Sequence, residues 1–123
     1  MSLSTVLTCL AIGIVSGVIA ALCGVGGGVV MVPAFVFFLG LPQKVAVATS
    51  LAVIIPTAIM ATTQNVKNDF VSWKVALLTA LSASLFAYFG AGWLKSMSNE
   101  TLTRLFGSVL VLFGVRMLLQ GKA

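Results

Sequence analysis

The sequence predicts an all-α integral membrane protein with four transmembrane helices and one shorter half-helix. Three observations support this class: 60% of the 123 residues are apolar, only 7% are charged, and the mean hydropathy is +1.20. A soluble domain would have roughly a quarter of its residues charged. Because so few polar side chains are available to cover a water-exposed surface, we expect a multi-pass protein of the cell membrane.

The first part of the chain predicts one full helix followed by a shorter piece. No residue before Lys44 is charged, so the apolar run is about twice the ~20 residues that one span needs. The glycine-rich stretch 24–28 interrupts this run and predicts a first helix over Leu3–Cys23 and a second over Val29–Leu39. The second piece is too short to cross ~30 Å, so we expect a glycine-broken re-entrant half-helix. Two tilted full spans are the alternative.

Three further spans follow, separated by short polar loops. They are predicted over Val45–Thr63, Val75–Leu94 and Leu102–Leu119. Ser98 or Asn99 precedes the last of them and could cap its N-terminus. No linker divides the chain, so residues 1–123 are expected to form one transmembrane domain.

The charged residues exclude several classes of function. The chain has no histidine and only two carboxylates, so neither a conventional zinc site nor a charged catalytic triad can be assembled. We therefore expect no enzyme, no metal and no cofactor. The seven cations are scattered along the chain, which argues against a nucleic-acid partner. They divide almost equally between the two membrane sides, so they predict no orientation.

The glycine-rich break is the first candidate binding site. It consists of Gly24, Gly26, Gly27 and Gly28, and Pro33 follows it. Non-helical backbone at membrane depth persists only where it is buried in protein or lines a watery cavity. The N-terminus of the following half-helix would attract an anion through its unpaired N–H groups and its dipole. A turn between helices that binds nothing is the alternative.

The second candidate lies on the next span. Ser50, Thr57 and Gln64 are spaced by seven residues, which places them nearly on one face over about 21 Å, and Thr49 adjoins Ser50. Pro56 removes a helical hydrogen bond, so hydroxyls and a freed carbonyl could coordinate an oxyanion or a sodium ion. Alternatively, the hydroxyls donate back to their own helix. No acidic residue lies inside a predicted span, which favours an anionic substrate over a cationic one.

A stripe of small residues marks the span Val75–Leu94. Its members follow three- and four-residue steps: Ala76, Ala80, Ala83, Ser84, Ala87, Gly90 and Ala91. In lipid, such stripes allow helix backbones to approach closely, so they predict a compact bundle. Four spans alone enclose too little space for a solute pathway, so a transporting protein would need a second copy, most simply as a homodimer.

Short motifs follow one another along the whole chain in a fixed order. They are Gly24-Val25-Gly26-Gly27-Gly28, Val32-Pro33, Gly40-Leu41-Pro42, Ala48-Thr49-Ser50-Leu51, Phe70-Val71-Ser72-Trp73-Lys74, Gly90-Ala91 and Leu105-Phe106-Gly107. This ordered set resembles one repeat of the sulfite exporter TauE/SafE family, also called toluene-sulfonate uptake permeases. The resemblance implies a membrane carrier of sulfite, sulfonates and related sulfur-containing anions, with the glycine break and the pair Thr49-Ser50 in the substrate path. Most members contain two fused repeats, so a single repeat implies a homodimer.

These arguments together predict a homodimeric secondary transporter of small anions. Its partners would be the anionic substrate, the lipid bilayer and a second copy of the chain. An accessory or assembly subunit that transports nothing is the alternative from a different class. A small multidrug-type cation exporter would need a carboxylate within its first helix, and no acidic residue precedes Asp69.

Overall fold

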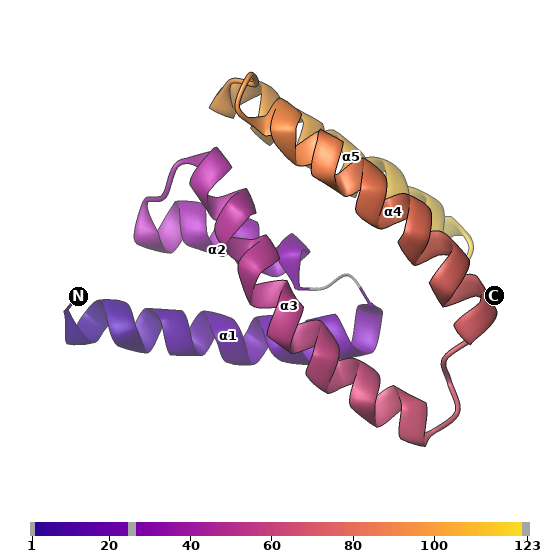
Figure 1. Cartoon of the computed structure of the whole chain (residues 1–123). Coiled ribbons are helices and arrows are strands. Elements are labelled where there is room, and N and C mark those ends of the chain that lie inside the picture. Colours follow the sequence, from indigo (N-terminus) through magenta and orange to yellow (C-terminus); the bar gives the residue numbers. More distant parts are fainter. Residues whose placement is uncertain (1, 25–26, 122–123) are drawn as a thin grey trace.

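The computed structural model describes residues 2–24 and 27–121 (Figure 1). The described residues form five helices and no strand, namely α1 (Leu3–Cys23), α2 (Gly28–Leu39), α3 (Gln43–Lys67), α4 (Trp73–Leu94) and α5 (Asn99–Leu119). Within this part of the chain, all helices except α2 are long and apolar enough to cross a membrane. The predicted all-α membrane fold is therefore confirmed. The predicted bounds of α1 are those observed, whereas α3 extends beyond Val45–Thr63 at both ends.

Two glycines define the break between α1 and α2. Gly24 ends α1 with φ +72°, and its N–H donates to the Ala20 carbonyl at 2.9 Å. Gly27 precedes α2 with φ +83°, and no side chain caps this helix. Both φ values lie in the left-handed region, which costs residues with a Cβ about 1–2 kcal/mol. The helix therefore ends where the sequence supplies residues that tolerate this conformation.

The helix α2 runs antiparallel to α1 and lies against it (Figure 1). At the start of α2, a Cβ built on Gly27 would contact Ser16 and Ala20 of α1. Further along α2, Phe35 belongs to the same buried cluster as Ile12, which is closer to the start of α1. The chain therefore returns along α1 after the glycine break.

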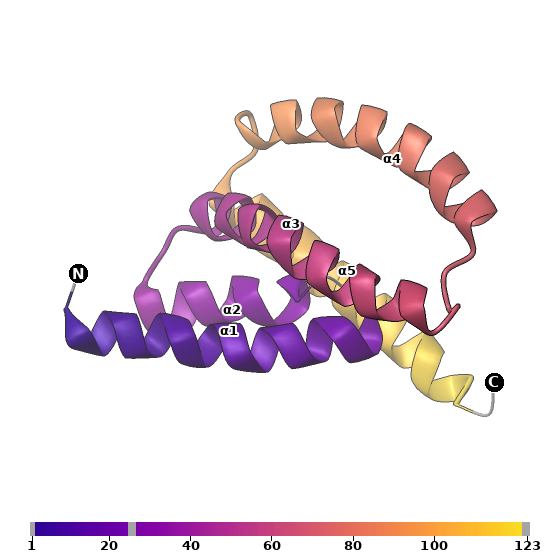
Figure 2. The ribbon, with the colours of Figure 1, turned by 60° about the horizontal axis from the view of Figure 1, so that its bottom comes forward.

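The helix α3 runs in the same general direction as α1 (Figures 1 and 2). Near its start, Ala46 joins the cluster that contains Ile12, and further along Pro56 shares a groove with Gly17. The segment between α1 and α3 therefore carries the chain back to the level of Ile12, about the middle of α1. A re-entrant path would return to the side from which it entered and would make α1 and α3 antiparallel. The observed direction argues against a re-entrant return, whereas α2, with 12 residues, is shorter than the second full span of the alternative.

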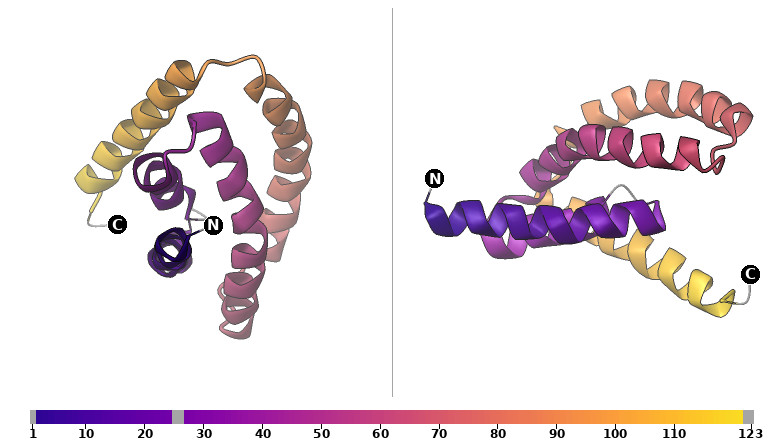
Figure 3. Two further views of the ribbon diagram at one scale, coloured as in Figure 1. Left: turned by 90° about the vertical axis from the view of Figure 1, so that its left-hand side faces the viewer. Right: turned by 90° about the horizontal axis from the view of Figure 1, so that it is seen from below.

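The buried core lies between α1, α2 and α3, whereas α4 stands apart from it (Figures 2 and 3). The core residues are Ile12, Met31, Val32, Phe35 and Ala46. No residue of α4 is buried, and the small-residue stripe of this helix is exposed except at the half-buried Ala76. The expectation of a compact bundle therefore holds for α1–α3 but is wrong for α4, because no helix of the described chain covers its small residues.

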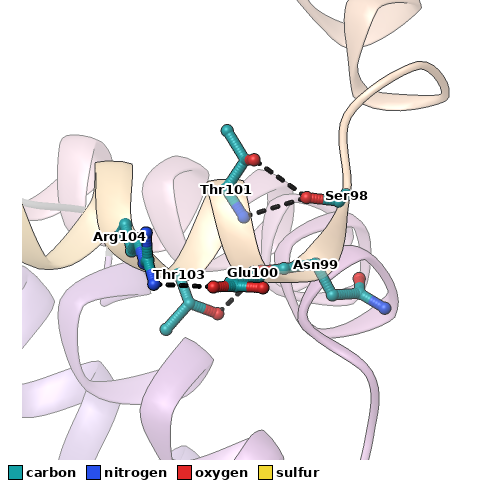
Figure 4. A network of polar contacts seen from close by, with 6 residues as sticks. All are labelled: Ser98, Asn99, Glu100, Thr101, Thr103 and Arg104. Carbon is teal, nitrogen blue, oxygen red and sulfur yellow. Dashed lines mark hydrogen bonds and ion pairs between the residues drawn. The ribbon is translucent and has the colours of Figure 1, made fainter.

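A local hydrogen-bond network starts α5 (Figure 4). The Ser98 hydroxyl oxygen accepts a hydrogen bond from the Thr101 N–H at 3.1 Å, so Ser98 is the cap that the sequence allowed. Glu100 lies in the first turn and pairs with Arg104 at 2.6 Å. A carboxylate at this position also interacts favourably with the positive end of the helix dipole.

Candidate anion-binding groove

A groove of about 320 Å³ lies between the end of α1 and the second half of α3. The α1 side contributes Ala20, Ala21 and Gly24, and the α3 side contributes Ile54, Thr57, Ala58, Ala61, Thr62 and Asn65. The structure therefore brings together two predicted site residues, Gly24 and Thr57. It adds two polar side chains that sequence reasoning missed, Thr62 and Asn65.

The open N-terminus of α2 contacts one wall of this groove, although no residue of α2 lines it. A Cβ built on Gly28 would lie 3.7 Å from the Cδ1 atom of Ile54, which is one of the groove walls. Gly27 is buried and has no side-chain cap, and the first N–H groups of a helix have no partner within it. Ser16, which neighbours Gly27, is seven residues from the end of α1, so α2 begins about 10 Å inside that end. Gly26, also predicted here, lies outside the described residues.

The hydroxyls of α3 donate to their own helix, as the alternative interpretation expected. Ser50 Oγ donates to the Val47 carbonyl at 2.8 Å, and Thr57 Oγ1 donates to the Val53 carbonyl at 2.9 Å. Each proton is therefore already used, and each oxygen retains only acceptor capacity toward a ligand. An anion needs donors, so these two hydroxyls would have to rotate away from the backbone to bind one.

The remaining predicted residues lie away from this groove. Thr49 lines a separate groove between α3 and α4, and Pro33 lines another between α2 and α5. Ser50 is buried, with an exposed fraction of 3%, and Gln64 is exposed on the surface of α3. The predicted common face of Ser50, Thr57 and Gln64 therefore contributes only Thr57 to the groove.

Helix periodicity explains why Asn65 lines the groove and Gln64 does not. Ile54, Ala58, Ala61 and Asn65 follow steps of four, three and four residues, so they lie along one side of α3. A strict step of seven drifts by about 20° per repeat in a straight helix. The steps from Ile54 to Ala61 and from Ala58 to Asn65 drift equally but start near the middle of the groove. Thr57 lies about 60° from Ile54, at the edge of the groove, so the same drift carries Gln64 out of it.

Ser16 is a buried polar residue that the sequence analysis also missed. Its exposed fraction is 2%, and its Oγ has no hydrogen-bond partner among the described residues. Ser16 shares one face of α1 with Ile12 and Ala20, at steps of four residues, and all three are buried. The sequence signal that could have identified Ser16 is that it is the one polar residue in this otherwise apolar row.

Comparison with known proteins identifies the family. The family model for the sulfite exporter TauE/SafE matches residues 9–123. The chain belongs to this family. Members of the TauE/SafE family are described as exporters, and the relatives of this chain are named as membrane transporters rather than enzymes. Together with its four apolar helices, this membership identifies the chain as a multi-pass membrane protein.

Three curated relatives of this TauE/SafE chain match it over most of its length. The chain is 32% identical over 112 residues to the probable membrane transporter protein YunE of Bacillus subtilis, which covers 91% of the chain and 41% of YunE. It is 27% identical over 124 residues to a probable membrane transporter protein of Haemophilus influenzae, with 95% and 47% covered. It is 27% identical over 112 residues to one of Xylella fastidiosa, with 82% and 40% covered. The chain therefore spans less than half the length of each. No solved structure matches the chain.

Proposed function

We propose that this chain is half of a secondary membrane transporter for small anions. Sulfite and sulfonates are the first substrates to test. The observation that carries the proposal is the uncapped N-terminus of α2 beside a groove that contains Asn65. The family membership supports transport, and the description of the family suggests the sulfur-containing substrate class.

The groove offers hydrogen-bond donors and no carboxylate. The first N–H groups of α2 and the positive end of its dipole attract negative charge. Further along α3, roughly 12 and 16 Å from Ile54, the Thr62 hydroxyl and the Asn65 amide supply donors toward the other end of the groove. None of the residues that line the groove is acidic, so the carbonyls at the C-terminal end of α1 are the main negative groups beside an oxyanion there. A cation would lack the counter-charge that such groups normally require at membrane depth.

The direction of α2 fits this role. Broken helices place unpaired backbone groups inside the bilayer, and transporters use them to hold substrates near the middle of the membrane. Here α1 continues past the point at which α2 begins. The open end of α2 therefore lies deeper in the helix bundle than the end of α1. In the proposal, the substrate binds at this break and the two halves of the assembly move around it.

We propose that two copies of the chain form the transporter as a homodimer. No residue of α4 is buried, and its small residues would let a helix of a second copy approach closely. The relatives are more than twice as long as the matched segment, which supports an assembly with two such units. The accessory-subunit alternative requires the same packing surface but no anion site.

Flux through proteoliposomes tests the proposal. We expect radiolabelled sulfite, or a small sulfonate, to cross liposomes that contain the protein at least ten-fold faster than protein-free liposomes. Gly27→Leu should abolish this flux, because a side chain at φ +83° next to the Ser16 carbonyl displaces the start of α2. Gly114→Leu is the matched control, since nothing lies within 4 Å of a Cβ at that position. If the unaltered chain forms intact dimers but transports neither anion, the accessory-subunit alternative would be supported instead.

A further inference from the structure

A second groove lies at the other end of α3, away from the glycine break. Its volume is about 380 Å³, and it lies between the first two turns of α3 and the last turn of α4. Lys44, Lys95 and Thr49 form its polar part, and Val45, Ala48 and Leu94 contribute to its apolar walls. The groove therefore combines two cations with an apolar surface.

Hydrogen bonds hold one of these cations in place. The Lys44 ammonium donates to the Lys95 carbonyl at 3.2 Å, and the Lys44 backbone N–H donates to Asn99 Oδ1 at 3.0 Å. These bonds join the start of α3 to the residue that follows α4 and to the start of α5. The Lys44 side chain is thereby fixed beside Lys95 with two of its three N–H donors still available.

No carboxylate of the described chain neutralises this pair of lysines. Glu100 is paired with Arg104 on α5 (Figure 4), and Asp69 lies in the loop at the opposite ends of α3 and α4. None of the residues that line the groove is acidic. The groove therefore presents two positive charges at the end of two membrane-spanning helices.

We propose that this groove binds an anionic phospholipid. The headgroup phosphate would contact Lys44 and Lys95, and an acyl chain would lie along Val45, Ala48 and Leu94. Basic pockets between transmembrane helices are suited to anionic headgroups, since each Lys near the membrane surface adds to the attraction. Val45 and Ala48 are exposed and no residue of α4 is buried, so the apolar wall of the groove is accessible to lipid chains. Trp93, exposed near the end of α4, is the kind of side chain that favours the headgroup region.

Native mass spectrometry of the detergent-solubilised protein tests this proposal. Titration with phosphatidylglycerol should give one preferred lipid per chain, bound about ten-fold more tightly than phosphatidylcholine, whose headgroup is neutral overall. Lys95→Gln should weaken phosphatidylglycerol binding about 5-fold and the pair Lys44→Gln/Lys95→Gln about 25-fold, from ~1 kcal/mol per lysine. Lys95→Gln leaves the Lys44–Lys95 hydrogen bond possible, because the backbone carbonyl of residue 95 accepts it.

The chain provides a matched control at its opposite end. Lys67→Gln/Lys74→Gln removes the same charge from the other ends of α3 and α4, and it should change binding less than 2-fold. Ala48→Phe keeps both lysines but fills the space beside the apolar wall, so it should abolish preferred binding of phosphatidylglycerol.

Several results would overturn the proposal. Equal losses from the two lysine pairs would show that net charge alone governs binding. Competition by glycerol 3-phosphate at the same concentration as the lipid would show a site for a water-soluble anion. Binding of phosphatidylglycerol to monomers but not to dimers would show that a second copy of the chain covers the groove.

Discussion

Gly27 and Ser16 are in close backbone contact, since a Cβ on Gly27 would lie 3.1 Å from the Ser16 carbonyl oxygen. This contact fixes the point along α1 at which α2 begins. It therefore also fixes the depth of the open helix end that we propose as an anion site. Two properties of Gly27 permit the contact, namely its missing side chain and its φ of +83°.

Gly27→Ala should lower the free energy of unfolding by about 1–2 kcal/mol, because alanine strongly disfavours this φ. Its methyl group would also press against the Ser16 carbonyl, a backbone atom that cannot move aside on its own. Denaturation in mixed detergent micelles measures this change. Gly13→Ala is the control: nothing lies within 4 Å of a Cβ there, and it should be neutral or stabilise α1 by up to ~1 kcal/mol. Equal stability of both variants would contradict the observed break.

Asn65→Leu should reduce sulfite flux at least ten-fold, because it removes an amide donor from the groove. Gln64→Leu is the adjacent control, and flux should change less than two-fold because Gln64 is exposed away from the groove. The two rates are compared in proteoliposomes of equal protein content. A larger loss in Gln64→Leu would favour the face predicted from the step of seven residues.

Ser16→Ala should raise the free energy of unfolding by about 1 kcal/mol, because the buried hydroxyl has no partner among the described residues. Ser84→Ala on α4 is a matched control with an exposed side chain, and it should change stability by less than ~0.5 kcal/mol. The same micelle assay serves both variants. A destabilised Ser16→Ala protein would reveal a hydrogen bond that the described residues do not include.

Ala83→Phe should weaken dimerisation at least ten-fold, because a large ring in the small-residue stripe holds a second helix away. Leu85→Phe adds a similar ring to the opposite side of α4 and should leave the dimer intact. Energy transfer between labelled copies in lipid vesicles reports the monomer–dimer equilibrium. Unchanged dimerisation in Ala83→Phe would place the interface on another helix.

Features that depend on neighbouring residues were predictable from the sequence. Leu3–Cys23 was located correctly because a glycine cluster follows a long uncharged run, and α2 begins only one residue before its predicted start. The α3 helix extends to Gln43 and Lys67 because polar residues can continue a helix beyond the membrane core, where hydropathy no longer indicates it. Whether the hydroxyls of α3 are free to bind a ligand was less predictable. Ser50 and Thr57 can donate either to a ligand or to their own helix, and the composition favours neither.

The sequence by itself determined that this chain is a membrane protein, which residue ranges form its helices, and which residues interrupt them. Only the tertiary structure decided that α2 returns along α1, that Asn65 rather than Gln64 lines the groove, and that α4 lacks a partner within the described chain. The physical reason is that lipid is as apolar as the side chains themselves, so hydrophobicity selects the membrane but not the helix faces that meet. Close contacts such as that between Gly27 and Ser16 select those faces, and they join residues that the sequence does not place side by side.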